Sequence, residues 1–398
     1  MAKTDRDNPG IRSLFNPLWC YHGFRMSVLG LSVFGVIMVF SSSAVSSASE
    51  GKSPFTDSLS QVIVCVVGLM AGMIVSMLPV DMYRRSAFAV MVGALGLQAL
   101  TFTPLGVGQY GNNGWIAVPG TSGTFQPAEV TKLALCVWMP SALIAARRIL
   151  GDRARRTTWK DVVSAYRGVI IVYGAALVLV VGGKDLGTAM IVMLIGFVAL
   201  LVSGFPGGKL AVIAGVGVGV VIALVASSPN RRERVLAAYM PCTGSDAQEI
   251  CYQSTHARYA IASGGFLGVG LGNSREKWNY LPAAHNDFIF AIIGEETGFV
   301  GCAMVILIFV ILGWCLLFSA MQAKDRYSAI ALMCVATWFV GQALVNIGVV
   351  VGIFPVFGVP LPFVSSGGSS MLACLIASGF AAGLMRQQPQ VKADTSRL

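Results

Sequence analysis

Three acidic residues stand at the start of one hydrophobic stretch, "LPAAHNDFIFAIIGEETGFVG" (residues 281–301), in a chain with only 18 acidic residues. They are Asp287, Glu295 and Glu296. A carboxylate can act as a general base toward a hydroxyl group, or it can hold a divalent cation such as Mg²⁺ or Mn²⁺. Asp287 precedes the apolar run, directly after His285 and Asn286. We therefore expect Asp287 at the water-accessible mouth of a helix, as the reactive group or as a metal ligand, with His285 either contributing to the site or lying on the surface.

The three acids do not form one cluster on a regular helix. Glu295 lies about 12 Å deeper than Asp287 and about 80° around the axis, and Glu296 lies about 180° around. We predict that both glutamates are structural members of the helix bundle, paired with lysine or with backbone groups.

A second pair of charges lies in "FQPAEVTKLAL", where Glu129 and Lys132 share one helix face at i, i+3 spacing. Two interpretations are open. The pair can neutralise itself near the outer membrane boundary, or Lys132 can offer its charge to a phosphate or activate a carboxylate while Glu129 holds it in place.

Two helix starts are further candidates for substrate binding. Asp185 in "GGKDLGTAM" begins a helix, where an aspartate is a favoured N-cap. The loop "GIFPVFGVPLPFVSSGGSS" (352–370) ends in Ser366, Gly367, Gly368 and Ser369 before the last helix. Such a start offers N–H groups and hydroxyls to an anion. The alternative is a serine-capped helix whose glycines allow close packing.

These residues must be positioned by a membrane protein. The 398-residue chain is 55% hydrophobic and 12% charged, with a mean hydropathy of +0.73, whereas a soluble domain has about 25% charged residues. We predict an all-α polytopic fold, because runs of about 20 apolar residues recur. About ten spans are expected to start near residues 26, 59, 86, 128, 167, 186, 209, 287, 327 and 368.

The basic residues set the orientation. Lysine and arginine are concentrated in alternate short loops and in both tails, so we predict cytoplasmic termini. We divide the chain into a cytoplasmic tail (1–25), one membrane domain (26–385) and a second tail (386–398). The net charge of +10 reflects this bias and attraction to anionic membrane lipid. Nucleic-acid binding is excluded because there is no soluble basic domain.

Two regions are predicted to lie outside. The Gly- and Pro-rich segment 103–130, which is uncharged until Glu129, should form a structured loop on the membrane surface, with Trp115 and Phe125 at the interface. The second is a large extracellular loop, 228–286, between the seventh and eighth helices. It contains Cys242 and Cys251 in "PCTGSDAQEIC", for which we predict a disulfide because the outer side is oxidising.

Four blocks together resemble the SEDS family (shape, elongation, division and sporulation) from about residue 26 to 385. They are "GTFQPAEVTKLAL", "KDLGTA", "IASGGFLGVGLGNSREKWNYLPAAHNDFIFAIIGEETG" and "QALVNIGVVVGIFPVFGVPLPFVSSGGSS". Within the family, "WNYLPAAHNDFIFAIIGEETG" is most similar to the division branch, FtsW, and the elongation branch, RodA, is a close second.

The resemblance implies a ten-helix peptidoglycan glycosyltransferase in the bacterial cytoplasmic membrane, at the division septum. Such an enzyme polymerises lipid II into a growing glycan strand at the outer face. Its partners would be a class B penicillin-binding protein, which crosslinks the strands, and other division proteins. Transfer from an α-linked lipid diphosphate to a β-1,4 glycan is inverting. The alternatives are an elongation-type polymerase, a lipid II flippase or transporter, and a non-enzymatic scaffold.

The resemblance also assigns residues. The family's essential aspartate matches Asp287, its external-loop residues match Trp115, Glu129 and Lys132, and its Ser-Gly-Gly-Ser motif matches Ser366, Gly367, Gly368 and Ser369. The chain departs from the family at Gly114, where the family has an arginine that is expected to contact phosphate. Lys184, Arg231, Arg232 and Arg234 are the candidates to replace that arginine.

Overall fold

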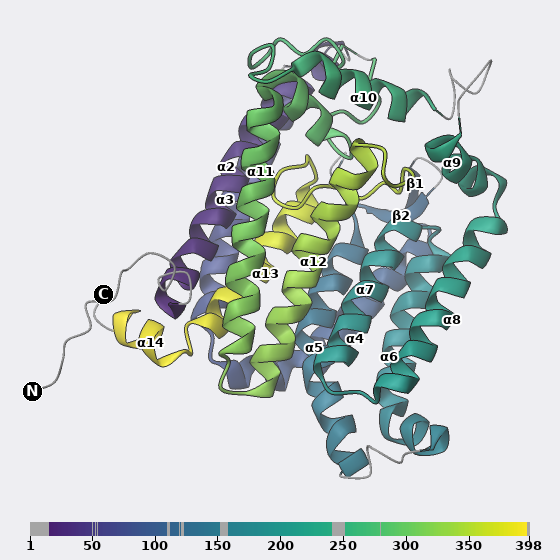
Figure 1. The fold of residues 1–398 in the computed structure, drawn as a ribbon, viewed down its shortest axis with the longest axis vertical. Helices are drawn as coiled ribbons and strands as arrows, with labels where there is room; N and C mark the ends of the chain where they lie inside the picture. The colour runs from purple at the N-terminus through teal and green to yellow at the C-terminus, as the bar shows by residue number, and fades with distance from the viewer. Residues whose placement is uncertain are drawn as a thin grey trace, which may run out of the picture.

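The fold was obtained as a computed structural model. It describes residues 16–49, 51, 53, 55–109, 112–118, 120, 123–151, 158–240, 251–278 and 280–395. Ten long helices form a bundle (Figure 1). They are α2 (Pro17–Ser49), α3 (Thr56–Met77), α4 (Val80–Ala99), α5 (Pro127–Leu150), α6 (Trp159–Gly182), α7 (Leu186–Val202), α8 (Gly207–Ala226), α11 (Ile289–Met321), α12 (Arg326–Val350) and α13 (Gly368–Met385).

Nine helices in the described part of the chain are long and apolar enough to cross a membrane, and α7, with 17 residues, is shorter. The predicted class, an all-α polytopic membrane protein, is confirmed. The count of ten spans and the cytoplasmic position of the termini remain predictions.

Three helices begin earlier than the apolar runs indicated, at Pro17, Val80 and Trp159 rather than near 26, 86 and 167. The reason is that a helix starts where its backbone is capped, not where its side chains become apolar. At α6, the Thr158 side chain accepts a hydrogen bond from the Asp161 N–H, and the Asp161 carboxylate accepts one from the Thr158 N–H.

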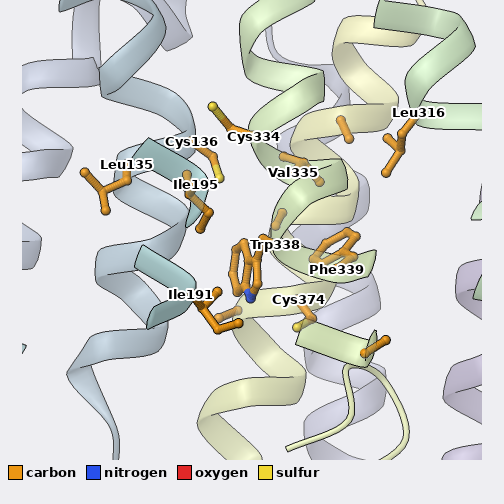
Figure 2. Close-up of a cluster of buried hydrophobic side chains, with 14 of the residues drawn as sticks. Leu135, Cys136, Ile191, Ile195, Leu316, Cys334, Val335, Trp338, Phe339 and Cys374 are labelled. Carbon is orange, nitrogen blue, oxygen red and sulfur yellow. The ribbon is translucent and has the colours of Figure 1, made fainter. Parts of the chain in front are cut away.

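Small residues allow close contacts between helices. A Cβ added at Gly379 of α13 would lie 2.0 Å from the Gly72 carbonyl oxygen of α3, so the two backbones touch, as is common between membrane helices. Elsewhere the core is built from large side chains. Figure 2 shows Trp338 and Phe339 of α12 among residues of α5, α7 and α13.

The segment between α4 and α5 is a small sheet. After the 3₁₀ turn η1 (Leu100–Phe102), strands β1 (Gly106–Gln109), β2 (Asn112–Ala117) and β3 (Thr124–Phe125) pair antiparallel in the order β1-β2-β3. A structured loop was predicted here, but its strands were not, because they are short and lack an apolar alternation. The Asn113 N–H donates to the Gly183 carbonyl at 2.8 Å, which ties the sheet to the start of α7.

The segment between α8 and α11 contains two helices, α9 (Pro229–Tyr239) and α10 (Tyr252–Gly264). Together with β1 and β2 they gather at one end of the bundle (Figure 1), which we call the cavity end. Cys251 is disulfide-bonded, and its predicted partner Cys242 lies outside the described residues. The short helix α14 (Pro389–Thr395) follows α13 and contacts α2.

Candidate active site

A cavity of about 610 Å³ opens at the cavity end of the bundle. Its wall comes from β2, the turn before α7, the α8–α9 junction, the turn before α11 and the loop that leads into α13. Five residues that the sequence singled out for substrate or metal binding line it: Trp115, Asp185, Asp287, Gly367 and Ser369. Residues from five distant parts of the chain therefore meet in one hollow.

Asp287 lies in a turn that is fixed from two sides. Its carbonyl oxygen accepts a hydrogen bond of 2.8 Å from the Asn346 side chain of α12. The Ser365 hydroxyl donates to the Asn286 carbonyl at 2.7 Å, and the Ser366 N–H donates to the His285 carbonyl at 2.9 Å. These bonds leave the half-buried Asp287 carboxylate facing the cavity.

The surroundings of Asp287 favour its neutral form. Burial, and after it the nearby Asp185 carboxylate, raise the pKa of Asp287 against the opposing effect of Arg234, and the net result is a shift from 3.8 to about 6. A carboxyl group with a pKa near neutrality is suited to accept a proton in a reaction at physiological pH.

Asp185 is both a helix cap and part of the cavity wall. One carboxylate oxygen accepts from the Thr188 N–H and the other from the Gln126 side chain, each at 2.9 Å. The N-cap interpretation is therefore right, and the same side chain also lines the cavity. A Cβ at Gly114 would lie 3.6 Å from Asp185 Oδ2, so the position where the family has arginine is beside this carboxylate.

Three cations line the cavity: Lys184, Arg231 and Arg234. The Arg231 guanidinium donates to the carbonyls of Leu224 and Lys184, at 3.2 and 3.4 Å. Among the described residues, no carboxylate forms an ion pair with any of the three. Arg232, the fourth candidate to replace the missing arginine, is exposed and does not line the cavity.

Glu129 and Lys132 lie away from this cavity wall, although the sequence made them candidates for substrate binding. The Lys132 ammonium is 2.8 Å from Glu129 Oε1 and 2.7 Å from Gln342 Oε1, and it stands 5.0 Å from the centre of the Trp338 ring. Both charged side chains are 1% exposed. The geometry matches the self-neutralising pair and gives no path from Lys132 to a ligand in the cavity.

Three other candidates also support the site without lining it. His285 and Ser366 hold the turn through the backbone hydrogen bond between them. A Cβ at Gly368 would lie 3.6 Å from Val64 of α3, so this glycine packs against a helix. The first turn of α13 does present the hydroxyls of Ser369 and Ser370 to the cavity. The packing interpretation therefore holds for Gly368, whereas the N-cap of α13 is Gly367 and no serine side chain caps the helix. Anion binding by this helix start remains a prediction.

Glu295 and Glu296 are structural, as predicted. Glu295 accepts hydrogen bonds from the Ser274 hydroxyl and the Arg275 N–H. Glu296 pairs with Lys277 at 3.0 Å and accepts from the Ser41 hydroxyl. The two acids fasten the segment before α11 to α11 and α2.

Several uncharged polar residues of the cavity were not predicted from the sequence. Asn112, Gln126, Ser228, Gln253 and Ser370 all line it. Amides and hydroxyls are common in loops, and no spacing distinguishes these from others. Only the fold brings them together.

A family model described as "Cell cycle protein", for FtsW, RodA and SpoVE, matches residues 22–390. The chain belongs to the FtsW/RodA/SpoVE family. This confirms the resemblance to SEDS proteins. A probable peptidoglycan glycosyltransferase FtsW from Mycobacterium tuberculosis is 35% identical over 96% of this chain and 70% of that protein. Stage V sporulation protein E from Bacillus subtilis is 31% identical over 88% and 92%.

Solved structures agree with the family's fold. A chain from a peptidoglycan synthase complex that coordinates polymerization and crosslinking has a TM-score of 0.73 at 25% identity, covering 93% of this chain and 98% of that one. Thermus thermophilus RodA has a TM-score of 0.66 at 23% identity, covering 94% and 97%.

Proposed function

We propose that this FtsW/RodA/SpoVE-family chain is a peptidoglycan glycosyltransferase that polymerises lipid II into glycan strands at the outer face of the cytoplasmic membrane. The observation that carries the proposal is one cavity that contains both a carboxyl of raised pKa, Asp287, and three cations that form no ion pair with a carboxylate among the described residues. The carboxylate can accept the proton of a hydroxyl nucleophile, and the cations can stabilise the negative charge of a diphosphate leaving group.

The reaction assigns a role to each group. The Asp287 carboxylate accepts the proton of the attacking sugar hydroxyl, while the hydroxyl oxygen forms a bond to the anomeric carbon of the second sugar. The bond from that carbon to the lipid diphosphate breaks, and the departing oxygen takes the electron pair. Lys184, Arg231 and Arg234 stabilise the resulting negative charge. A single displacement inverts the configuration, so no covalent sugar intermediate is needed.

A divalent cation fits this donor set. Mg²⁺ is commonly bound by one or two carboxylates together with substrate phosphates, and Asp185 and Asp287 both line the cavity. Among the described residues there is no group of three His, Cys, Asp or Glu side chains for a protein-only site. Bound there, the ion would neutralise diphosphate charge. Calorimetric titration with Mn²⁺ should show binding that Asp287→Asn weakens.

We further propose a class B penicillin-binding protein as the partner and the division septum as the location. The support is the likeness to a chain from a polymerization and crosslinking complex, and to relatives named FtsW. Co-purification with such a transpeptidase, and fluorescence imaging of the tagged chain in dividing cells, test the two points.

The deciding experiment uses purified protein with its transpeptidase, lipid II and Mg²⁺. We expect glycan strands on a gel, and none from a folded Asp287→Ala variant. Normal strand formation by that variant would remove Asp287 from the chemistry. Movement of lipid II across vesicle membranes without polymerisation would favour a flippase instead.

A further inference from the structure

A cluster of aromatic rings lies on α10, outside the machinery described above. His256 is surrounded by three tyrosines: Tyr252 at 4.2 Å between ring centres, Tyr259 at 5.8 Å and Tyr280 at 6.2 Å. The Tyr280 ring is stacked on the His256 ring, with 15° between their planes. We call these four residues the aromatic platform.

The platform combines apolar faces with polar atoms. His256 Nδ1 is 2.6 Å from a carboxylate oxygen of Glu276, and this histidine and Glu276 are largely buried. By contrast, Tyr259 is 58% exposed and Tyr280 is 54% exposed. Two exposed tyrosine rings with their hydroxyls therefore lie beside a largely buried His256–Glu276 pair.

The segment that carries Tyr280 and Glu276 is rigidly fixed. The buried Glu295 carboxylate accepts hydrogen bonds from the Ser274 hydroxyl and from the N–H groups of Arg275 and Glu276. The Leu281 N–H donates to the Glu276 carbonyl. Exposed rings on a fixed backbone lose little conformational freedom on binding, which favours affinity.

The platform also lies next to the cavity along the same helix. Gln253, which follows Tyr252 in the first turn of α10, lines the cavity. One helix thus has a residue in the cavity wall and three rings of the platform. Figure 1 shows α10 lying across the cavity end of the bundle.

We infer that the aromatic platform binds sugar rings of the glycan strand next to the catalytic cavity. This rests on the proposed function. The carbon-bound hydrogens of a pyranose pack on the electron-rich face of an aromatic ring, and its hydroxyls can exchange hydrogen bonds with tyrosine hydroxyls. A lipid tail or an apolar protein helix would cover the exposed Tyr259 and Tyr280 without offering their hydroxyls a hydrogen-bond partner, so the mixed surface favours a saccharide.

The test removes the exposed rings and leaves the cavity intact. We expect the double variant Tyr259→Ala/Tyr280→Ala to consume lipid II at the wild-type initial rate but to make shorter strands. Its affinity for a lipid-free peptidoglycan oligosaccharide, measured by calorimetry on the full chain, should fall roughly tenfold, as expected for two lost ring contacts. Tyr259→Phe/Tyr280→Phe should retain most of the strand length.

Phe266→Ala is the matched control. Phe266 is an exposed aromatic residue between the platform's helix and α11, but its ring stacks on Phe299 and not on the platform. It should leave strand length and oligosaccharide affinity unchanged.

Wild-type strand length and affinity in the double alanine variant would overturn the inference while leaving the proposed function intact. A defect seen only when the transpeptidase is present would overturn it in favour of a protein-docking surface. Wild-type protein that forms no strands would overturn the proposed function, and the inference with it.

Discussion

Lys132 and Glu129 form an ion pair in the closed interior of the bundle, with 2.8 Å between nitrogen and oxygen. The second oxygen of Glu129 has no hydrogen-bond partner among the residues that the structure describes. Lys132 is therefore the main compensation for a buried carboxylate, and its contacts with Gln342 and Trp338 connect α5 to α12.

Replacing Lys132 by Met should destabilise the fold by about 3–5 kcal/mol, because it leaves an uncompensated buried charge. Thermal unfolding in detergent measures the loss. The double variant Lys132→Met/Glu129→Gln should recover much of it. Arg84→Gln is the control, since Arg84 pairs with Asp325 at an exposed site and such pairs contribute about 1 kcal/mol or less. Equal losses of stability in Lys132→Met and Arg84→Gln would contradict this account.

The rate of glycan synthesis should fall as the pH drops through about 6, because Asp287 must be ionised to accept a proton and its pKa is about 6. Asp185→Asn removes a neighbouring negative charge while keeping a good helix cap. It should move the acidic limb of the pH–rate profile to lower pH. Arg234→Gln should move the limb to higher pH. Limbs that coincide in all three proteins would show that Asp287 does not control the rate.

The same pKa shift predicts an effect on stability. Folding raises the pKa of Asp287 from 3.8 to about 6, so its ionisation opposes folding, and stability is lost as the pH rises through this window. Asp287→Asn should be more stable than wild type at pH 8, by the order of 2 kcal/mol, and equal to it below about pH 4. Unfolding curves at the two pH values, without divalent cation, provide the comparison. A variant less stable than wild type at pH 8 would reject the burial argument.

The three cavity cations should act mainly on substrate binding. Lys184→Met, Arg231→Gln and Arg234→Gln should each raise the KM for lipid II roughly tenfold, the loss expected for a hydrogen bond to a charged group. Steady-state kinetics at fixed salt measure this. Arg232 lies on the same helix as Arg231 and Arg234 but does not line the cavity. The KM of Arg232→Gln should therefore stay at the wild-type value. A KM for Arg232→Gln that rises as much as the others would indicate a general charge effect.

Much of the fold could be predicted from hydropathy. The helices that begin at Pro127, Leu186 and Gly368 start within a residue of the predicted positions. Asp287 was predicted at the water-accessible mouth of a helix, and it lines the cavity just before α11. The direction in which a side chain points was harder to predict. Glu129 and Lys132 were correctly placed on one face, but the sequence does not say whether that face meets the cavity or the core.

The cation group shows a second limit. Lys184 and Arg231 are 47 positions apart in the chain and meet only because α9 returns over the start of α7. Such a contact has no local period, so the sequence could name both as candidates but could not bring them together.

Gly298 interrupts α11 with a φ of +66°. A Cβ there would lie 2.3 Å from the Gly268 nitrogen. Gly298→Ala should therefore destabilise the protein by more than about 2 kcal/mol, through backbone strain and collision. Gly219→Ala in α8 is the control, because a Cβ there meets nothing within 4 Å and alanine favours a helix. Thermal unfolding of both variants provides the measurement. Wild-type stability in Gly298→Ala would contradict the need for a glycine at this position.

The fastening of Glu295 and Glu296 also bears on how the chain is made. Synthesis runs from the N-terminus, and the side-chain and backbone donors that contact these two acids, from Ser41 and from residues 274–277, all precede them. When α11 emerges from the ribosome, the groups that compensate its two carboxylates already exist. The two carboxylates of α11 can therefore form their hydrogen bonds and ion pair as soon as the helix enters the membrane, without a segment that is synthesised later. This order suits a protein that is assembled in the membrane while it is being translated.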